Sequence, residues 1–318
     1  MGKKKRRVLT VIVIFVVLLA AILVGFSAYL GKQIVASSTQ LVTNEATKNV
    51  HEDLWAAYGF NYAAFSQAYT IEKVDLTSSF DGHTIPADFI YTDVKNNDVV
   101  IMAHGLGGNR YTNYPIAELF LQNGYNVITY DQRSSGENIA AKTTFGYWEK
   151  YDLIDCLEYA KGLTKAKKIG VWGESFGGAT AIQAVAYEDI QTDIAFLVLD
   201  CPVSSMEWMV AEEMKSMDLG IPLDYIVWCG SLMNKLELGF SYQEVDSAAI
   251  AKAIHIPTLV LNSEADKVTP YFMGRDIYDN LTSTKKDLWT VTDSEHVGLW
   301  LDHNEEYCNR VSRLMAES

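Results

Sequence analysis

Short apolar runs rich in β-branched residues alternate with helical patterns along most of the chain. The apolar runs predict strands at 71–76, 84–91, 98–103, 126–130, 168–172, 194–199, 256–262 and 287–291. Helical spacing predicts helices at 113–123, 148–163, 176–187, 274–281 and 303–315. The turn signal Asp81-Gly82 makes the first two strands an antiparallel pair. The later alternation predicts an α/β fold with a mostly parallel central sheet flanked by helices and an active site at the strands' carboxyl ends.

One interval breaks this rhythm. Residues 201–255 separate two predicted strands and are far longer than a crossover needs, which predicts a helical lid. They contain five of the chain's nine methionines together with several aromatic residues. Such adaptable side chains suit a pocket for an acyl or aromatic group, but methionines at helical spacing also indicate simple packing. The sequence leaves both interpretations open.

The longest apolar run lies at the N-terminus. Residues 8–30 follow the basic stub 1–7 and are long enough to span a bilayer once as a helix. A cleaved signal peptide is the competing interpretation, but the run exceeds the usual apolar region and no clean small-x-small site follows Leu30. The excess of Lys and Arg before the run predicts a cytoplasmic N-terminus. We expect a stalk with a short helix over 31–70 and an extracytoplasmic catalytic domain over 71–318.

Charge and cysteine usage limit the classes of partner. The net charge is −14, and beyond residue 32 the chain has 20 basic against 40 acidic residues, a net charge of −20. Such a domain should repel nucleic acid and anionic headgroups. The four cysteines are irregularly spaced without a C-x-x-C pair, so we expect no bound metal. Disulfides and buried free thiols both stay open.

The string Gly173-Glu174-Ser175-Phe176-Gly177 provides a candidate nucleophile. It follows the predicted strand 168–172 and opens the predicted helix 176–187, so Ser175 lies at a strand-to-helix elbow. The two glycines leave room for the strand and helix to pass closely beside a serine in a sparsely allowed backbone conformation.

A serine hydroxyl needs a base to take its proton and an acid to orient that base. Of the six histidines, His296 follows the last predicted strand by a few residues, in a loop from which it can reach the elbow. Asp266 follows the preceding strand and is the preferred orienting acid, with Glu264 and Asp200 as rivals. The predicted triad is Ser175, Asp266 and His296.

A tetrahedral intermediate also needs two preorganised donors for its oxyanion. The backbone N–H of Phe176, at the start of the predicted helix, is one. The loop His104-Gly105-Leu106-Gly107-Gly108 follows the strand 98–103 and supplies the second, for which we choose Leu106.

These motifs, in this order and on these strand ends, resemble the α/β-hydrolase superfamily over roughly residues 70–318. Within it the chain looks most like the membrane-anchored or cell-surface serine hydrolases of Gram-positive bacteria, related to esterases and acyl-peptidases. The resemblance implies acyl transfer to Ser175, hydrolysis by water and no cofactor. It also marks Asp131 and Arg133 as a structural pair in a loop similar to the family's D-x-R-G-x-G sequence, where Ser134 replaces the usual glycine.

Three functions fit these residues. The first is hydrolysis of a small-molecule carboxylic ester or other acyl substrate. The second is a serine peptidase or amidase of the same fold, which would use the same triad. The third is a surface-binding protein that keeps the fold without the chemistry, against which the intact Ser-Asp-His set counts. The sequence indicates no oligomeric state.

Overall fold

The computed structural model describes residues 2–92, 98–163 and 168–318. The chain divides into two compact units. We call the first, residues up to Thr39 together with Glu207–Glu244, the anchor unit. The second, Gln40–Met206 with Val245–Ser318, is the sheet unit.

The sheet unit is built on one central sheet. Among the described residues it has the strand order β1-β2-β4-β3-β5-β6-β7-β8, in which β1 pairs antiparallel with β2, β2 pairs antiparallel with β4, and the later neighbours are parallel. The strands are β1 (Thr70–Thr77), β2 (Thr84–Tyr91), β3 (Val99–Ala103), β4 (Asn126–Tyr130), β5 (Ile169–Glu174), β6 (Ile194–Asp200), β7 (Thr258–Ser263) and β8 (Lys286–Val291). The strands and sheet type predicted from the sequence are therefore confirmed.

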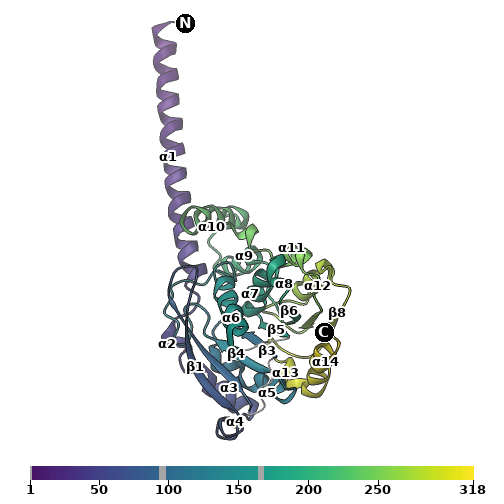
Figure 1. The fold of residues 1–318 in the computed structure, drawn as a ribbon. Helices are drawn as coiled ribbons and strands as arrows, with labels where there is room; N and C mark the ends of the chain where they lie inside the picture. The colour runs from purple at the N-terminus through teal and green to yellow at the C-terminus, as the bar shows by residue number, and fades with distance from the viewer. Residues whose placement is uncertain (1, 93–97, 164–167) are drawn as a thin grey trace. The chain divides into compact units, whose positions relative to one another are not determined.

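Helices cover both faces of this sheet (Figure 1). Strand side chains alternate between the faces, so in β3 Val99, Ile101 and Ala103 join the core with α6, α7 and α12, whereas Val100 and Met102 join the core with α5 and α14. Burial on both faces explains why the parallel strands are continuous apolar runs. The principal helices are α5 (Tyr114–Gln122), α6 (Glu149–Leu163), α7 (Phe176–Val185), α12 (Phe272–Asn280) and α14 (Asn304–Glu317).

Shorter helices complete the sheet unit. They are α2 (Asn44–Thr47), α3 (Val50–Tyr58), α4 (Tyr62–Ala68), α8 (Glu188–Gln191), α11 (Ser247–Ile250) and α13 (Leu299–Asp302), with 3-10 turns at Arg110–Asn113 and Ala251–Ala253. The segment 31–70, expected to be a stalk with one short helix, differs in detail. The first helix continues through Thr39, and three short helices, α2, α3 and α4, follow it where one was expected. Gly59 adopts φ 61° and ends α3 in a left-handed cap, which separates α3 from α4.

The anchor unit combines the N-terminal helix with most of the insertion. It holds α1 (Lys3–Thr39), most of α9 (Met206–Ser216), α10 (Leu223–Leu238) and a 3-10 turn at Tyr242–Glu244. Helix α1 is long and apolar enough to cross a membrane, with a mean hydropathy of 3.3 over its most apolar window. Within this unit α10 lies across α1 and packs against it (Figure 1).

Candidate active site

Ser175 joins β5 to α7 in a strained conformation. Its φ of 52° and ψ of −112° are a combination that residues with a side chain rarely adopt. The Ser175 N–H donates to the carbonyl of Asp200, 2.7 Å away, which ties the elbow to the end of β6. A Cβ at Gly173 would lie 2.5 Å from the carbonyl oxygen of Gly177, and one at Gly177 would collide with the carbonyl of Ala103. The two glycines are therefore required by backbone contacts on both sides of the serine.

The structure brings the three predicted triad residues together. Ser175 Oγ lies 2.9 Å from His296 Nε2, and His296 Nδ1 lies 2.7 Å from Asp266 Oδ2. An ionised carboxylate only accepts hydrogen bonds, so Nδ1 carries the proton and Nε2 is free to accept from the serine hydroxyl. Of the two rival acids, Glu264 is exposed and Asp200 accepts a hydrogen bond from Tyr307.

Thr269 holds Asp266, the predicted orienting acid, in place, and the sequence did not reveal this contact. Asp266 Oδ1 accepts from the N–H groups of Val268 and Thr269 at 2.8 and 2.9 Å, and its Oδ2 accepts from the Thr269 hydroxyl at 2.8 Å. Burial alone would raise the pKa of Asp266, but hydrogen bonds and the charge of His296 hold it below its usual value. The signal was present as Asp-x-x-Thr after a strand, because an aspartate there can cap the turn that follows it.

The predicted oxyanion donors flank the serine. Gly105 lies beside the elbow, since a Cβ built on it would be 3.5 Å from Ser175 Cβ, and Leu106 is the next residue. Phe176 is the first residue of α7, where N–H groups have no partner within the helix. In the described ranges, neither the Leu106 nor the Phe176 N–H donates a hydrogen bond. Both are free to bind an anion.

His104 holds the loop that carries Leu106. Its Nδ1 donates to the Gly105 carbonyl at 2.7 Å, and its Nε2 accepts from the Gln132 N–H at 3.0 Å. Burial lowers the pKa of His104 to about 4, so the imidazole is neutral and supplies one donor and one acceptor. It therefore supports the loop that carries Leu106.

Comparison with known proteins agrees with this architecture. A family model described as alpha/beta hydrolase fold matches residues 98–226. An esterase from Pyrococcus furiosus superposes with a TM-score of 0.65 at 24% identity, covering 81% of this chain and 95% of that one. An esterase from Exiguobacterium antarcticum gives 0.56 at 19% identity, covering 77% and 100%. The chain has the α/β-hydrolase fold.

Sequence relatives of the chain include bacterial and animal proteins. The uncharacterized protein YqkD of Bacillus subtilis is 26% identical over 240 residues, 73% of this chain and 77% of that protein. The rat lysophosphatidylserine lipase ABHD12 is 24% identical over 198 residues, 58% of this chain but only 46% of that protein.

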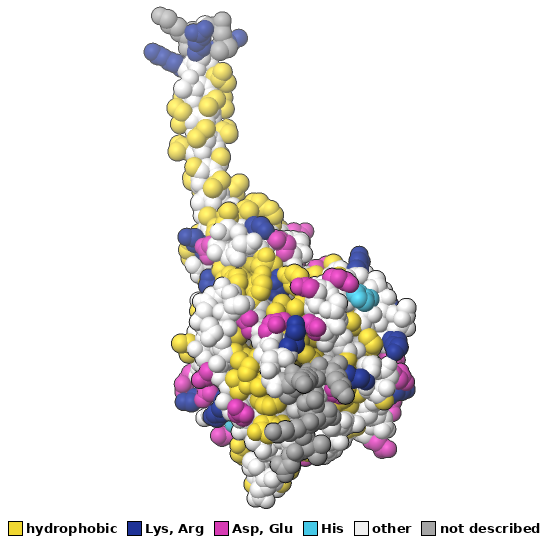
Figure 2. All heavy atoms as spheres, in the orientation of Figure 1, with side chains coloured by type: hydrophobic (Ala, Val, Ile, Leu, Met, Phe, Trp, Pro, Cys, Tyr) yellow, Lys and Arg dark blue, Asp and Glu magenta, His cyan; other side chains and the backbone are white. Residues whose placement is uncertain are grey.

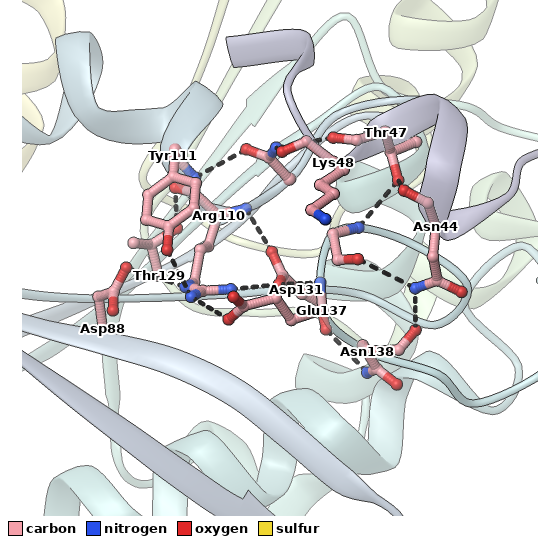
Figure 3. A network of polar contacts seen from close by, with 12 residues as sticks. Asn44, Thr47, Lys48, Asp88, Arg110, Tyr111, Thr129, Asp131, Glu137 and Asn138 are labelled. Atoms are coloured by element: carbon pink, nitrogen blue, oxygen red, sulfur yellow. Dashed lines mark hydrogen bonds and ion pairs between the residues drawn. The ribbon is translucent and has the colours of Figure 1, made fainter. Parts of the chain in front are cut away.

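A buried polar network joins the segment that follows the Leu106 loop to the loop after β4 (Figure 3). Arg110 donates through Nε to Asp88 at 3.0 Å, through Nη2 to Glu137 at 2.5 Å and through Nη1 to Asp131. Its backbone N–H also donates to Asp131, at 2.7 Å. Asn44, ahead of the sheet, donates to two carbonyls of the same loop. The carboxylates compensate the buried guanidinium and fix both loops.

The expected pairing of Asp131 with Arg133 is wrong. Asp131 binds Arg110, whereas Arg133 binds Asp81 in the β1–β2 turn and Asp152 on α6, at 2.8 and 3.1 Å. Arg133 points away from Asp131 because a carboxylate buried on α6 has to be matched there. Ser134, where the family's loop usually has glycine, has φ 60°, in the left-handed region that favours glycine.

Two carboxyl groups beside the triad keep protons at unusually high pH. Burial, followed by repulsion from Asp200, raises the pKa of Glu174 to about 7, and burial raises that of Asp200 to about 6. Glu174 also accepts a hydrogen bond from the Gly105 N–H at 3.3 Å. A carboxyl between two elbow glycines was the sequence signal for this partly buried acid.

Cys201 lies beside the triad. Its sulfur and the facing atoms of Asp266 and His296 lie within 4.8 Å of one another, close enough for metal ligands. Burial raises the pKa of the Cys201 thiol well above its usual value, whereas a metal ligand must be a thiolate. The histidine and carboxylate atoms also bind each other directly, so the set fits a triad better than a metal site. All four cysteines, which lie in the described ranges, are free thiols.

Proposed function

We propose that this protein is a serine hydrolase that cleaves carboxylic esters through Ser175, His296 and Asp266. The observation that carries the proposal is the unbroken relay from the strained Ser175 hydroxyl to His296 Nε2 and from Nδ1 to Asp266, at 2.9 and 2.7 Å. Hydrogen bonds at these lengths are those that nucleophilic catalysis requires.

Each residue has a role in two half-reactions. His296 takes the Ser175 proton as the hydroxyl oxygen attacks the ester carbonyl, and Leu106 and Phe176 N–H groups bind the oxyanion. His296 then gives the proton to the leaving alcohol, which leaves an acyl-enzyme. Water, deprotonated by the same imidazole, releases the acid. Asp266 orients the imidazole and stabilises its charged form, so the chain's own residues supply every group and no cofactor takes part.

The neighbours support one substrate class. Solved structures with this fold include esterases, and relatives include a lysophosphatidylserine lipase, so we favour a small-molecule or lipid ester over a peptide bond. A peptidase would use the same triad. In this proposal the insertion within 201–255 acts as the lid.

We also propose that α1 is an uncleaved anchor in the cell membrane, with its N-terminus in the cytoplasm and the sheet unit outside. Leu30, Ile34 and Val35 lie beyond the exposed apolar segment and are buried. Cleavage after residue 36 would remove these side chains together with Gly31, and so would remove the contacts that Gly31 and Ile34 make with α10. Retention of the helix keeps that packing, which supports an anchor of the membrane-bound hydrolase type.

The test uses the full chain in detergent. A fluorophosphonate probe should label Ser175, identified by peptide mass spectrometry, and nitrophenyl esters of increasing acyl length should be hydrolysed faster than aminoacyl amides. Ser175→Ala should lose activity by on the order of 10⁴-fold or more, whereas Ser204→Ala, at another buried serine, should not. Equal activity in Ser175→Ala and the wild type would refute the hydrolase, and faster cleavage of amides would make it a peptidase.

A further inference from the structure

Helices α1 and α10 are fastened together through glycines. A Cβ at Gly31 would lie 2.5 Å from the Cys229 carbonyl oxygen, and one at Gly230 would lie 2.6 Å from Ile34 Cγ2. These glycines let the two helix backbones approach closely. The contact starts at Ser27, whose hydroxyl is 2.6 Å from that of Tyr225. Helix α10 is therefore fixed at a defined height on α1.

That height matches the boundary of a bilayer. The large apolar side chains of α1 are exposed from Val8 to Phe26, and burial begins at Leu30. The twenty residues from Val8 to Ser27 rise about 30 Å at 1.5 Å per residue, which is the thickness of the hydrocarbon core. With the basic stub at the inner boundary, Ser27 and the start of α10 lie at the outer one.

Helix α10 presents an exposed apolar stripe of Trp228, Leu232 and Leu236, one turn apart. Their side chains are 53%, 43% and 70% exposed. Figure 2 shows hydrophobic side chains gathered where α10 meets α1. At 3.6 residues per turn the stripe is centred about 80° around α10 from Cys229 and Met233, which lie against α1. Because α10 crosses α1, a face about a quarter turn from the contact lies along the axis of α1 and is not covered by it.

We propose that the Trp228, Leu232 and Leu236 stripe lies in the outer interface of the bilayer that α1 spans, so that α10 is an in-plane membrane helix. The proposal rests on the membrane anchoring proposed above. The rings of Tyr225 and Trp228 stack with centroids 6.0 Å apart at the height where aromatic residues collect in membrane proteins. Met217 and Leu219, just before α10, are each 46% exposed and extend the apolar surface.

The occupant is a lipid surface bound through apolar contact rather than through charge. Segment 207–244 has seven acidic and two basic residues, a net charge of −5, which disfavours anionic headgroups. The continuity of the stripe with an apolar helix of membrane length argues for the bilayer over a soluble partner or a second copy, because α1 already holds the stripe at the membrane. The insertion would then lie at the surface of the membrane in which lipid esters dissolve.

The test places a fluorescent nitrobenzoxadiazole label at single introduced cysteines of the full chain in phosphatidylcholine nanodiscs. Cys308→Ser removes the half-buried native thiol, and the other three cysteines are buried. The labelled positions replace Trp228, Leu232 or Leu236 in turn, so one poorly folded variant leaves two. The matched controls are Glu237, which is exposed about 100° around α10 from Leu236, and Ile139, which is 81% exposed in the sheet unit.

Labels on the stripe should be quenched by lipids spin-labelled near the carbonyl at least about threefold more strongly than labels at the controls, and more weakly by aqueous iodide. Iodide quenching equal to that at the controls would overturn the proposal, as would a disulfide between Trp228→Cys copies, which would indicate a second copy. Carbonate extraction of the chain would overturn the anchor and this proposal together. Fluorophosphonate labelling of the same samples reports separately on Ser175.

Discussion

The strain at Ser175 can be measured by comparing two substitutions that remove the same hydroxyl. Ser175→Ala and Ser175→Gly both lose the hydrogen bond to His296, but only alanine keeps the Cβ that makes φ 52°, ψ −112° unfavourable. For glycine this conformation is the mirror image of φ −52°, ψ 112°, which lies in an allowed region. We therefore expect Ser175→Gly to be the more stable of the two.

The expected difference follows from opposing terms. A residue held in a sparsely populated region costs about 1–3 kcal/mol, and glycine loses about 0.5–1 kcal/mol more backbone entropy than alanine on folding. The difference leaves Ser175→Gly more stable than Ser175→Ala by about 0.5–2 kcal/mol. Ordinary positions show the reverse order, so the sign is the decisive quantity.

Urea unfolding of the full chain in detergent would measure this difference as a shift of the unfolding midpoint. The comparison requires that the unfolding free energy depends equally steeply on urea concentration in both variants. Ser263 provides the control, because it is buried on strand β7 and is absent from the residues with positive φ. There the glycine variant should be less stable than the alanine variant. If Ser175→Ala were as stable as Ser175→Gly while Ser263 showed the ordinary order, the serine would not be strained and the elbow argument would fail.

Three further changes test other parts of the structure. Asp266→Asn should lower kcat by on the order of 10³- to 10⁴-fold in an ester assay, because the amide no longer holds the imidazole proton on Nδ1. The free energy of unfolding should change little. A loss of kcat under tenfold would remove Asp266 from the triad. Asp200, buried with a pKa of about 6, binds a proton more tightly folded than unfolded, so its ionisation lowers stability as pH rises from 4 to 7. Asp200→Asn should therefore gain about 2–3 kcal/mol relative to wild type between pH 4 and 8 in urea unfolding, and a pH-independent difference would contradict the burial argument. Gly31→Ala should increase tryptic cleavage of the 207–244 segment about 5- to 100-fold, because the added Cβ meets the Cys229 carbonyl. Gly25→Ala is the control, since Gly25 has open space around it and the substitution should leave cleavage unchanged. Equal cleavage of the two variants would mean that the glycine contact is unimportant.

The fold and the candidate triad were predictable because their signals are local. A buried parallel strand is a run of five or six apolar residues, and each triad member follows the end of one such run. Once the strands are placed, parallel pairing brings their carboxyl ends to one edge. The order Ser175, Asp266, His296 then allows few other assignments, and the rivals Glu264 and Asp200 differ from Asp266 only in how the turn aims them.

The partners of buried charges were less predictable because several residues of opposite charge compete for each. Arg133 lies two residues from Asp131, yet the carboxylates it binds come from Asp81 and Asp152, in separate elements. Which carboxylate faces a guanidinium depends on the twist of the sheet and the rotation of α6. Spacing along the chain carries no information about either.

The packing of α1 on the insertion was the least predictable feature, and its cause lies in the residues that make it. Gly31 and Gly230 are 199 positions apart, and in the sequence no motif distinguishes either glycine from others in apolar helices. Only the close approach of two helix backbones gives them a role, since any Cβ at either site would meet the other helix. Ile34 and Val35 are buried although they follow the candidate membrane-spanning segment, so apolar character here continues past the length that a bilayer needs. An apolar run of membrane length that extends into small and apolar residues at helical spacing therefore indicates a helix that continues past the membrane as part of a folded unit. In a flexible stalk, polar residues would follow the apolar run directly.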